Sequence, residues 1–164
     1  VFNRARLIKN SKNRIPYGVN LIQKYRRESW IVFTENKKQA KEFNKIINTK
    51  GFKSALYNTD LDSAERLENL NKFKKADLNV LVTCTALDEG FDMPEADGAL
   101  ILSASSSKRQ RVQRMGRVLR ITENKPNALI VTVYSSKTEF DKLMEEAKRY
   151  HKEGVPVSWK RQDR

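Results

Sequence analysis

Short apolar runs alternate with longer stretches of helical periodicity along this chain, and this alternation limits the available folds more than any other feature. The apolar runs are WIVFT (30–34), KSALY (53–57), NVLVTCT (79–85), GALILSA (98–104) and NALIVTVY (127–134). Strands that alternate with helices predict βαβ units in an open sheet. The third run is continuously apolar at its centre, as parallel strands covered on both faces are. The sequence therefore predicts an α/β fold, with a mainly parallel sheet and helices on both faces.

The stretches between the runs carry apolar stripes with helical spacing and recognisable end signals. After the first run, Asn36 is the expected N-cap and Gly51 the expected stop. After the second run, a helix is expected to be capped by Asp62 or Ser63. The buried face of that helix is expected to comprise Leu67, Leu70 and Phe73. Further helices are expected at about residues 17–28, 106–120 and 136–154.

A length of 164 residues suits one domain with a single core. We expect a lead-in segment with one helix at 1–29, the α/β domain at 30–150, and a tail at 151–164. The tail has two open interpretations, a short edge strand or a frayed linker. The chain begins without Met and shows neither a signal peptide nor a long apolar run, so we expect a fragment of an intracellular protein without a membrane span.

The single cysteine and the single histidine are poor candidates for chemistry. Cys84 lies in an apolar run and is expected to be a buried core thiol. His151 lies in a charged stretch and is expected to be solvated. One cysteine allows no disulfide framework and no zinc cluster, and a reducing cytoplasmic or nucleoid-associated location follows.

Positive charge is in large excess and is concentrated in one segment. The formal net charge is +13, which favours a polyanionic partner such as nucleic acid, a nucleotide or an acidic membrane surface. Residues 108–120 contain five arginines, one lysine and no acid. A solvated helix would normally interleave acids, whereas a polyphosphate would supply the missing counter-charge. A plain basic surface helix remains the alternative.

The basic segment follows the fourth run, so it begins at the carboxyl edge of the predicted sheet, where open α/β sheets bind ligands. The sequence contains no G-x-x-x-x-G-K-[ST] and no G-x-G-x-x-G. The chain therefore lacks a P-loop and a dinucleotide fingerprint of its own. This combination indicates a site that acts on phosphates held mainly by something else.

Three motifs, in order, resemble those of superfamily 2 helicases. QRMGRVLR (113–120) resembles motif VI, VLVTCTALDEGFDMPEA (80–96) resembles motif V, and WIVFTENKKQAKEF (30–43) resembles motif IV. The resemblance implies the C-terminal RecA-like lobe of an ATP-dependent helicase or translocase. It also implies an N-terminal lobe of the same protein, which would carry the P-loop and hold most of the ATP and Mg²⁺.

In motif VI, the resemblance assigns Arg117 and Arg120 as arginine fingers at the γ-phosphate. Such fingers stabilise charge on the transferring phosphoryl oxygens. Gln113 resembles the residue that orients the γ-phosphate or the attacking water. Arg114 resembles a position that is structural or lies between the lobes, near the nucleotide.

In motif V, Gly90 resembles the glycine that lets the backbone approach the nucleotide, and Asp92 resembles the acid that contacts the ribose. An ordinary turn before Pro94 is the alternative interpretation. Cys84 stands where many relatives carry a phosphate-binding threonine. The resemblance further implies that nucleic acid is contacted by Thr34, Asn36, Lys37, Asn58, Thr59, Thr83 and Thr85.

Two other functions remain open beside the motor lobe. One is a nucleic-acid-binding RecA-like module without ATPase chemistry. The other is a nucleotide-binding metabolic domain, which the net charge and the missing glycine fingerprint disfavour. The DEGFDMPEA and GRVLR stretches look closer to repair- and restriction-type DNA translocases than to RNA helicases, so DNA is favoured over RNA as the partner.

Overall fold

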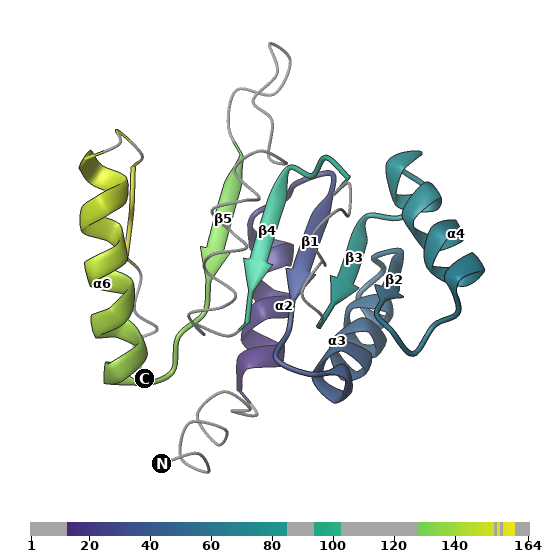
Figure 1. The fold of residues 1–164 in the computed structure, drawn as a ribbon, viewed down its shortest axis with the longest axis horizontal. Helices are drawn as coiled ribbons and strands as arrows, with labels where there is room; N and C mark the ends of the chain where they lie inside the picture. The colour runs from purple at the N-terminus through teal and green to yellow at the C-terminus, as the bar shows by residue number, and fades with distance from the viewer. Residues whose placement is uncertain (1–12, 85–93, 103–127, 153, 155, 160–164) are drawn as a thin grey trace.

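The computed structural model describes residues 13–84, 94–102, 128–152, 154 and 156–159. Over these residues, five strands form one sheet in the order β2-β3-β1-β4-β5 (Figure 1), and every pairing is parallel. The strands are β1 (Trp30–Phe33), β2 (Ser54–Tyr57), β3 (Val80–Thr83), β4 (Gly98–Ile101) and β5 (Leu129–Thr132). The helices described are α2 (Arg14–Lys24), α3 (Lys37–Thr49), α4 (Ser63–Lys74) and α6 (Lys137–Lys152). The predicted parallel α/β fold is confirmed.

Strand β1 lies at the centre of the sheet and is buried along its whole length, as are its neighbours β3 and β4. All five predicted apolar runs contain a strand. Strand β5 is at one edge and is only partly covered, with Ile130 42% exposed. Burial thus decreases from the centre toward this edge.

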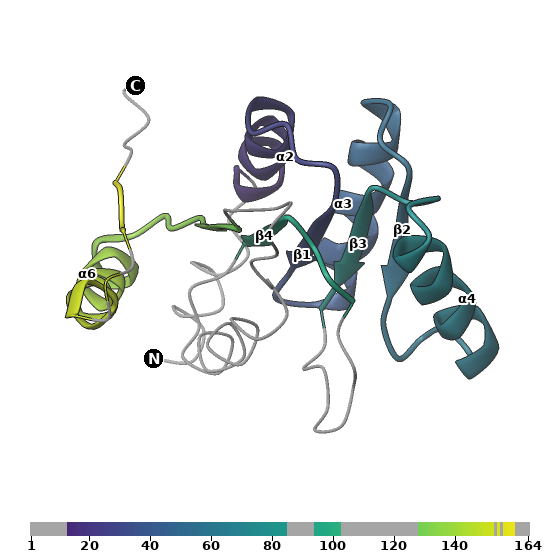
Figure 2. The same cartoon turned by 90° about the horizontal axis from the view of Figure 1, so that it is seen from above.

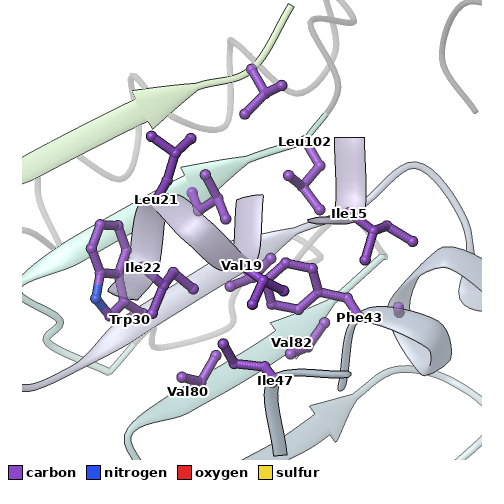
Figure 3. Close-up of a cluster of buried hydrophobic side chains, with 14 residues drawn as sticks. Ile15, Val19, Leu21, Ile22, Trp30, Phe43, Ile47, Val80, Val82 and Leu102 are labelled. Atoms are coloured by element: carbon purple, nitrogen blue, oxygen red, sulfur yellow. The ribbon is translucent and has the colours of Figure 1, made fainter. Parts of the chain in front are cut away.

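Helices cover both faces of the sheet (Figure 2). On one face, α2 and α3 pack on β1, β3 and β4 through a cluster that includes Val19, Phe43 and Trp30 (Figure 3). On the other face, α4 contributes Leu70 and Phe73 to a second, smaller cluster. The helix α2, which we assigned to the lead-in segment, therefore belongs to the main core.

The predicted end signals of α3 and α4 are present. The side chain of Asn36 accepts a hydrogen bond from the backbone N–H of Gln39, at 2.9 Å, and so caps α3. Gly51 has a φ of +85°, the left-handed conformation that commonly ends helices. At α4 the cap is Asp62, which accepts from the Glu65 N–H at 2.7 Å.

Three expectations about burial and boundaries were wrong. Leu67 is 57% exposed, so the buried face of α4 consists of Leu70 and Phe73 without it. The first described helix spans Arg14–Lys24 and not residues 17–28. Cys84 is half-buried, although it does pack against the larger cluster, because it lies just beyond the end of β3. His151 is exposed, as expected.

Helix α6 lies beyond the β5 edge (Figures 1 and 2) and is tied to the rest of the fold by a buried ion pair. The Arg14 guanidinium is 2.5 Å from Glu139 Oε2 and also donates to the carbonyl oxygens of Leu102 and Val133, at 2.7 and 3.2 Å. Arg14 thus joins the start of α2 to the ends of β4 and β5 and to the first turn of α6.

The described part of the tail packs on α6. The Trp159 ring stacks edge-on against Phe140, with centroids 5.1 Å apart. No strand occurs over residues 156–159, so the edge-strand interpretation finds no support there. None of the helices in the described ranges combines the length and the apolar character needed to cross a bilayer.

Candidate nucleic-acid interface

The parallel strands bring their carboxyl ends to one edge of the sheet, and the arrowheads in Figure 1 mark that edge. Phe33 at the end of β1 is in register with Thr83 of β3 and Ile101 of β4, and Tyr57 of β2 is in register with Thr83. The residues that end or follow β1, β2 and β3 therefore meet. They include the predicted nucleic-acid residues Thr34, Asn36, Lys37, Asn58, Thr59 and Thr83, whereas Thr85 lies outside the described residues.

Thr34 links the loop after β1 to the end of β3. Its backbone N–H donates to the Thr83 carbonyl at 2.9 Å, and its hydroxyl lies 3.2 Å from the same oxygen and 3.3 Å from the Asn36 carbonyl. Thr34 is fully buried. The hydroxyl is thus engaged within the protein, and the residue fixes the loop that carries Asn36 and Lys37.

The start of α3 is held by two side chains that bond to the backbone. Asn36 caps the helix, and Gln39 Oε1 accepts a hydrogen bond from the Glu35 N–H at 2.7 Å. Gln39 is buried beneath this turn. The two contacts fix the first helical turn and thereby the position of Lys37, whose side chain is 46% exposed.

Two lysines of α3 surround one acid from the loop after β2. Lys37 forms an ion pair with Asp60 Oδ1, and Lys41 Nζ lies 3.3 Å from Asp60 Oδ2. The hydrogen bond from Lys37, helped by Lys41, holds the pKa of Asp60 below its ordinary value of 3.8. Sequence reasoning missed Lys41, although its position one helical turn after Lys37 is a usable signal.

Asn58 and Thr83 each carry a buried polar atom that no other described residue pairs with. Asn58 Oδ1 accepts from the Asp60 N–H at 3.0 Å, but within the described ranges Asn58 Nδ2 has no partner, and neither has Thr83 Oγ1. Both residues are almost completely buried. Unpaired buried polar groups are costly and uncommon in folded proteins. Thr59, between Asn58 and Asp60, is exposed.

The predicted ATP-contacting residues lie outside the described residues; they are Gly90, Asp92, Gln113, Arg114, Arg117 and Arg120. The ends of the flanking strands are described. β3 and β4 lie on either side of β1 and end level with it. Both strands therefore end on the side where open α/β sheets bind ligands, and this topology fits a nucleotide there. In the described ranges no group of three metal-ligating side chains occurs.

Comparison with known proteins identifies the family. Residues 13–122 match the family described as the helicase conserved C-terminal domain. That match covers more than half of the chain, and the chain belongs to this family.

Several curated relatives are helicases or related proteins. The DNA 3'-5' translocase XPB2 of Sulfurisphaera tokodaii is 35% identical over 129 residues, which cover 79% of this chain and 28% of the relative. UvrABC system protein B of Thermosipho africanus is 32% identical over 69% of this chain and 18% of the relative. The ATP-dependent rRNA helicase RRP3 of Scheffersomyces stipitis is 26% identical over 72% of this chain and 24% of the relative. The chain thus spans less than a third of the length of these relatives.

Solved structures share the fold. The C-terminal domain of the DEAD-box protein Dbp5 superposes with a TM-score of 0.73 at 21% identity, over 88% of this chain and 82% of that one. The helicase domain of Pyrococcus furiosus Hef superposes with a TM-score of 0.60 at 22% identity, over 80% of this chain and 28% of that one. The RecA-like architecture expected from the motifs is therefore confirmed.

Proposed function

We propose that the chain is the C-terminal motor lobe of an ATP-dependent DNA helicase or translocase that acts inside the cell. The observation that carries the proposal is the carboxyl edge of the sheet. There the exposed cation Lys37 follows β1, whose two neighbours β3 and β4 end in register with it. Within the family assignment, residues 30–150 are proposed as the lobe, with 151–164 as the tail and 1–29 leading in from an N-terminal lobe; of this lead-in, α2 packs into the core of the lobe.

For ATP hydrolysis, the chain supplies residues that act on a nucleotide held mainly by another lobe. An N-terminal lobe would hold ATP and Mg²⁺, and the bound nucleotide supplies the phosphoryl group that is transferred to water. Arg117 and Arg120 stabilise negative charge on the phosphoryl oxygens, and Gln113 orients the attacking water or the γ-phosphate. Gly90 lets the backbone approach the nucleotide, Asp92 contacts the ribose, and Arg114 lies between the lobes. The sequence motifs support these roles.

For nucleic acid, we assign the half-buried Asn36 and the exposed Lys37 and Thr59 to contacts with backbone phosphates. The buried residues Thr34, Asn58 and Thr83 hold the loops that present them, and Thr85 follows in the motif V segment. Contacts to phosphates position a strand without reading its sequence. A motor that moves along a strand needs this kind of contact.

DNA is proposed as the partner on two grounds. The DEGFDMPEA and GRVLR stretches resemble DNA translocases, and the XPB2 relative at 35% identity is a DNA 3'-5' translocase. The RRP3 relative, an rRNA helicase, is 26% identical. A comparison of ATP hydrolysis stimulated by single-stranded DNA and by RNA of the same sequence decides between the two partners.

The decisive test of the motor function is Arg117→Ala in the full-length protein. Loss of an arginine finger removes a charge that stabilises the transition state, so the rate constant for ATP hydrolysis should decrease by about 10³- to 10⁵-fold. DNA binding without nucleotide should change little. Arg117→Lys should rescue only part of the activity because an ammonium lacks the planar fork of a guanidinium.

The opposite pattern would contradict the proposal. If Arg117→Ala leaves hydrolysis intact and abolishes DNA binding, the basic segment is a nucleic-acid patch. The chain would then be a nucleic-acid-binding RecA-like module that contributes no residue to ATP hydrolysis.

A further inference from the structure

At the carboxyl ends of the strands, the carboxylate of Asp60 pairs with two lysines. Lys37 and Lys41 lie one turn apart on α3, and each faces a different oxygen of Asp60. The side chains of Lys37, Lys41 and Asp60 are 46%, 60% and 37% exposed. The cluster therefore keeps one net positive charge, and a ligand can reach it from solvent.

The Asp60 carboxylate resembles a backbone phosphodiester in its charge and in its pair of oxygens. A carboxylate offers two oxygens that share one negative charge, as do the two non-bridging oxygens of a backbone phosphate. Lysine binds phosphate as a point charge, so the same two ammonium groups can bind either the carboxylate or a phosphate. Exposed ion pairs contribute little stability, so exchange of one anion for the other is not opposed by the fold.

The loop that carries Asp60 has an unmet hydrogen bond in its present arrangement. Asn58 Oδ1 accepts from the Asp60 N–H, while the buried Asn58 Nδ2 has no partner among the described residues. A buried donor that is left unpaired costs stability, so this arrangement of the loop is not the best that its hydrogen bonds allow.

We propose that Asp60 is an internal substitute for a backbone phosphate, which a bound DNA single strand displaces from Lys37 and Lys41. Lys41 is then a second phosphate-binding residue. The inference rests on the proposed function and adds a regulatory element to it. Asp60 lowers the affinity of the lysine pair for weakly held anions, so a strand must engage the rest of the edge to displace it.

The test is binding of a fluorescently labelled DNA single strand of about 15 nucleotides, followed by anisotropy at several salt concentrations. Asp60→Asn removes the competing charge and keeps the shape of the side chain. The affinity should rise by about fivefold at low salt, the size of one unit charge at about 4 Å in water, and the gain should shrink as salt rises. Asp60→Ser provides a second variant with the same expected direction.

Lys41→Ala tests the second phosphate contact. It should weaken binding and reduce the slope of log affinity against log salt by about 0.7, the value for one phosphate on a single strand. In a Lys37→Ala/Lys41→Ala background, the gain from Asp60→Asn should vanish.

A matched control exists on α4. Lys72 and Glu68 form another exposed ion pair, at 2.6 Å, within α4. Glu68→Gln changes the net charge of the chain as Asp60→Asn does and also releases one lysine. If both substitutions raise the affinity equally, the effect is one of net charge and the substitute role of Asp60 is wrong.

The inference can fail while the proposed function survives. An unchanged salt slope in Lys41→Ala would exclude Lys41 from binding, yet the Arg117→Ala result would stand independently. The inference is also overturned if the gain from Asp60→Asn persists when both lysines are removed.

Discussion

Arg14 is a full positive charge placed where water does not reach, with the residue only 1% exposed. Its guanidinium donates to two backbone carbonyls, to Ser135 Oγ at 2.7 Å, and to Glu139. Glu139 Oε2 also accepts from the Ser135 N–H at 2.9 Å. A buried ion pair is tolerable only when such additional hydrogen bonds compensate for the lost hydration. The network therefore sets how α2 and α6 meet the ends of β4 and β5.

At this residue, Arg14→Met should strongly destabilise the chain. The substitution leaves the Glu139 carboxylate buried without its cation, so the free energy of unfolding should fall by about 3–5 kcal/mol. Urea unfolding followed by circular dichroism measures this change.

Lys148→Met is the control for Arg14→Met, because Lys148 pairs with Glu145 on the exposed surface of α6. An exposed pair contributes about 0–1 kcal/mol, so this control should unfold almost as the wild type does. Equal effects of the two substitutions would show that the Arg14 network does not stabilise the fold. The double variant Arg14→Met/Glu139→Gln should lose less than the sum of the single losses because the two residues interact.

At the scale of elements, the first turn of α3 depends on its cap. Asn36→Ala leaves the Gln39 N–H without its acceptor, so the free energy of unfolding should fall by about 1 kcal/mol. Asn36→Asp should retain most of the stability, because a carboxylate also accepts this bond and favours a helix N-terminus. Thermal or urea unfolding measures both. Glu42→Ala, an exposed change within the same helix, is the control, and an equal loss there would contradict the role of the cap.

The strands could be predicted from the sequence because the central strands are covered on both faces and are therefore apolar without interruption. The buried face of α4 could not be predicted fully. Steps of three residues fall about 60° short of a full turn, so a 67-70-73 row winds around the helix and Leu67 leaves the buried side. The helix α2 starts at Arg14, ahead of the predicted start, and Pro16 fits inside its first turn because the backbone N–H groups there have no intrahelical acceptor.

The candidate site was predictable in part. The parallel topology alone places Thr34, Asn58 and Thr83 at one edge, since each follows or ends a strand. The pairing of Lys41 with Asp60 was not predictable in the same way. It depends on how the loop after β2 folds toward α3, which local sequence patterns do not encode.

At the scale of the whole molecule, the chain should be a poor ATPase by itself. It carries neither a P-loop lysine nor the associated magnesium ligands in a recognisable motif, so ATP would not be held for hydrolysis. Phosphate release by the purified chain, with and without single-stranded DNA, should stay near background, while the full-length protein should turn over ATP. Robust DNA-stimulated hydrolysis by the chain alone would contradict the division of labour between two lobes.

The position of β1 has a consequence for biosynthesis. β1 is the first strand of the sheet to leave the ribosome, yet it occupies the centre, and its hydrogen-bonding partners begin only at Val80 and Gly98. Both edges of WIVF lack their partners until the residues from Val80 emerge, and one edge still lacks its partner until the residues from Gly98 emerge. An open apolar strand edge invites pairing with other chains. The Trp30 ring lies so close to Gly98 that even a Cβ there would come within 2.6 Å of it. Synthesis must therefore proceed beyond Gly98 before both edges of β1 can be covered by β3 and β4.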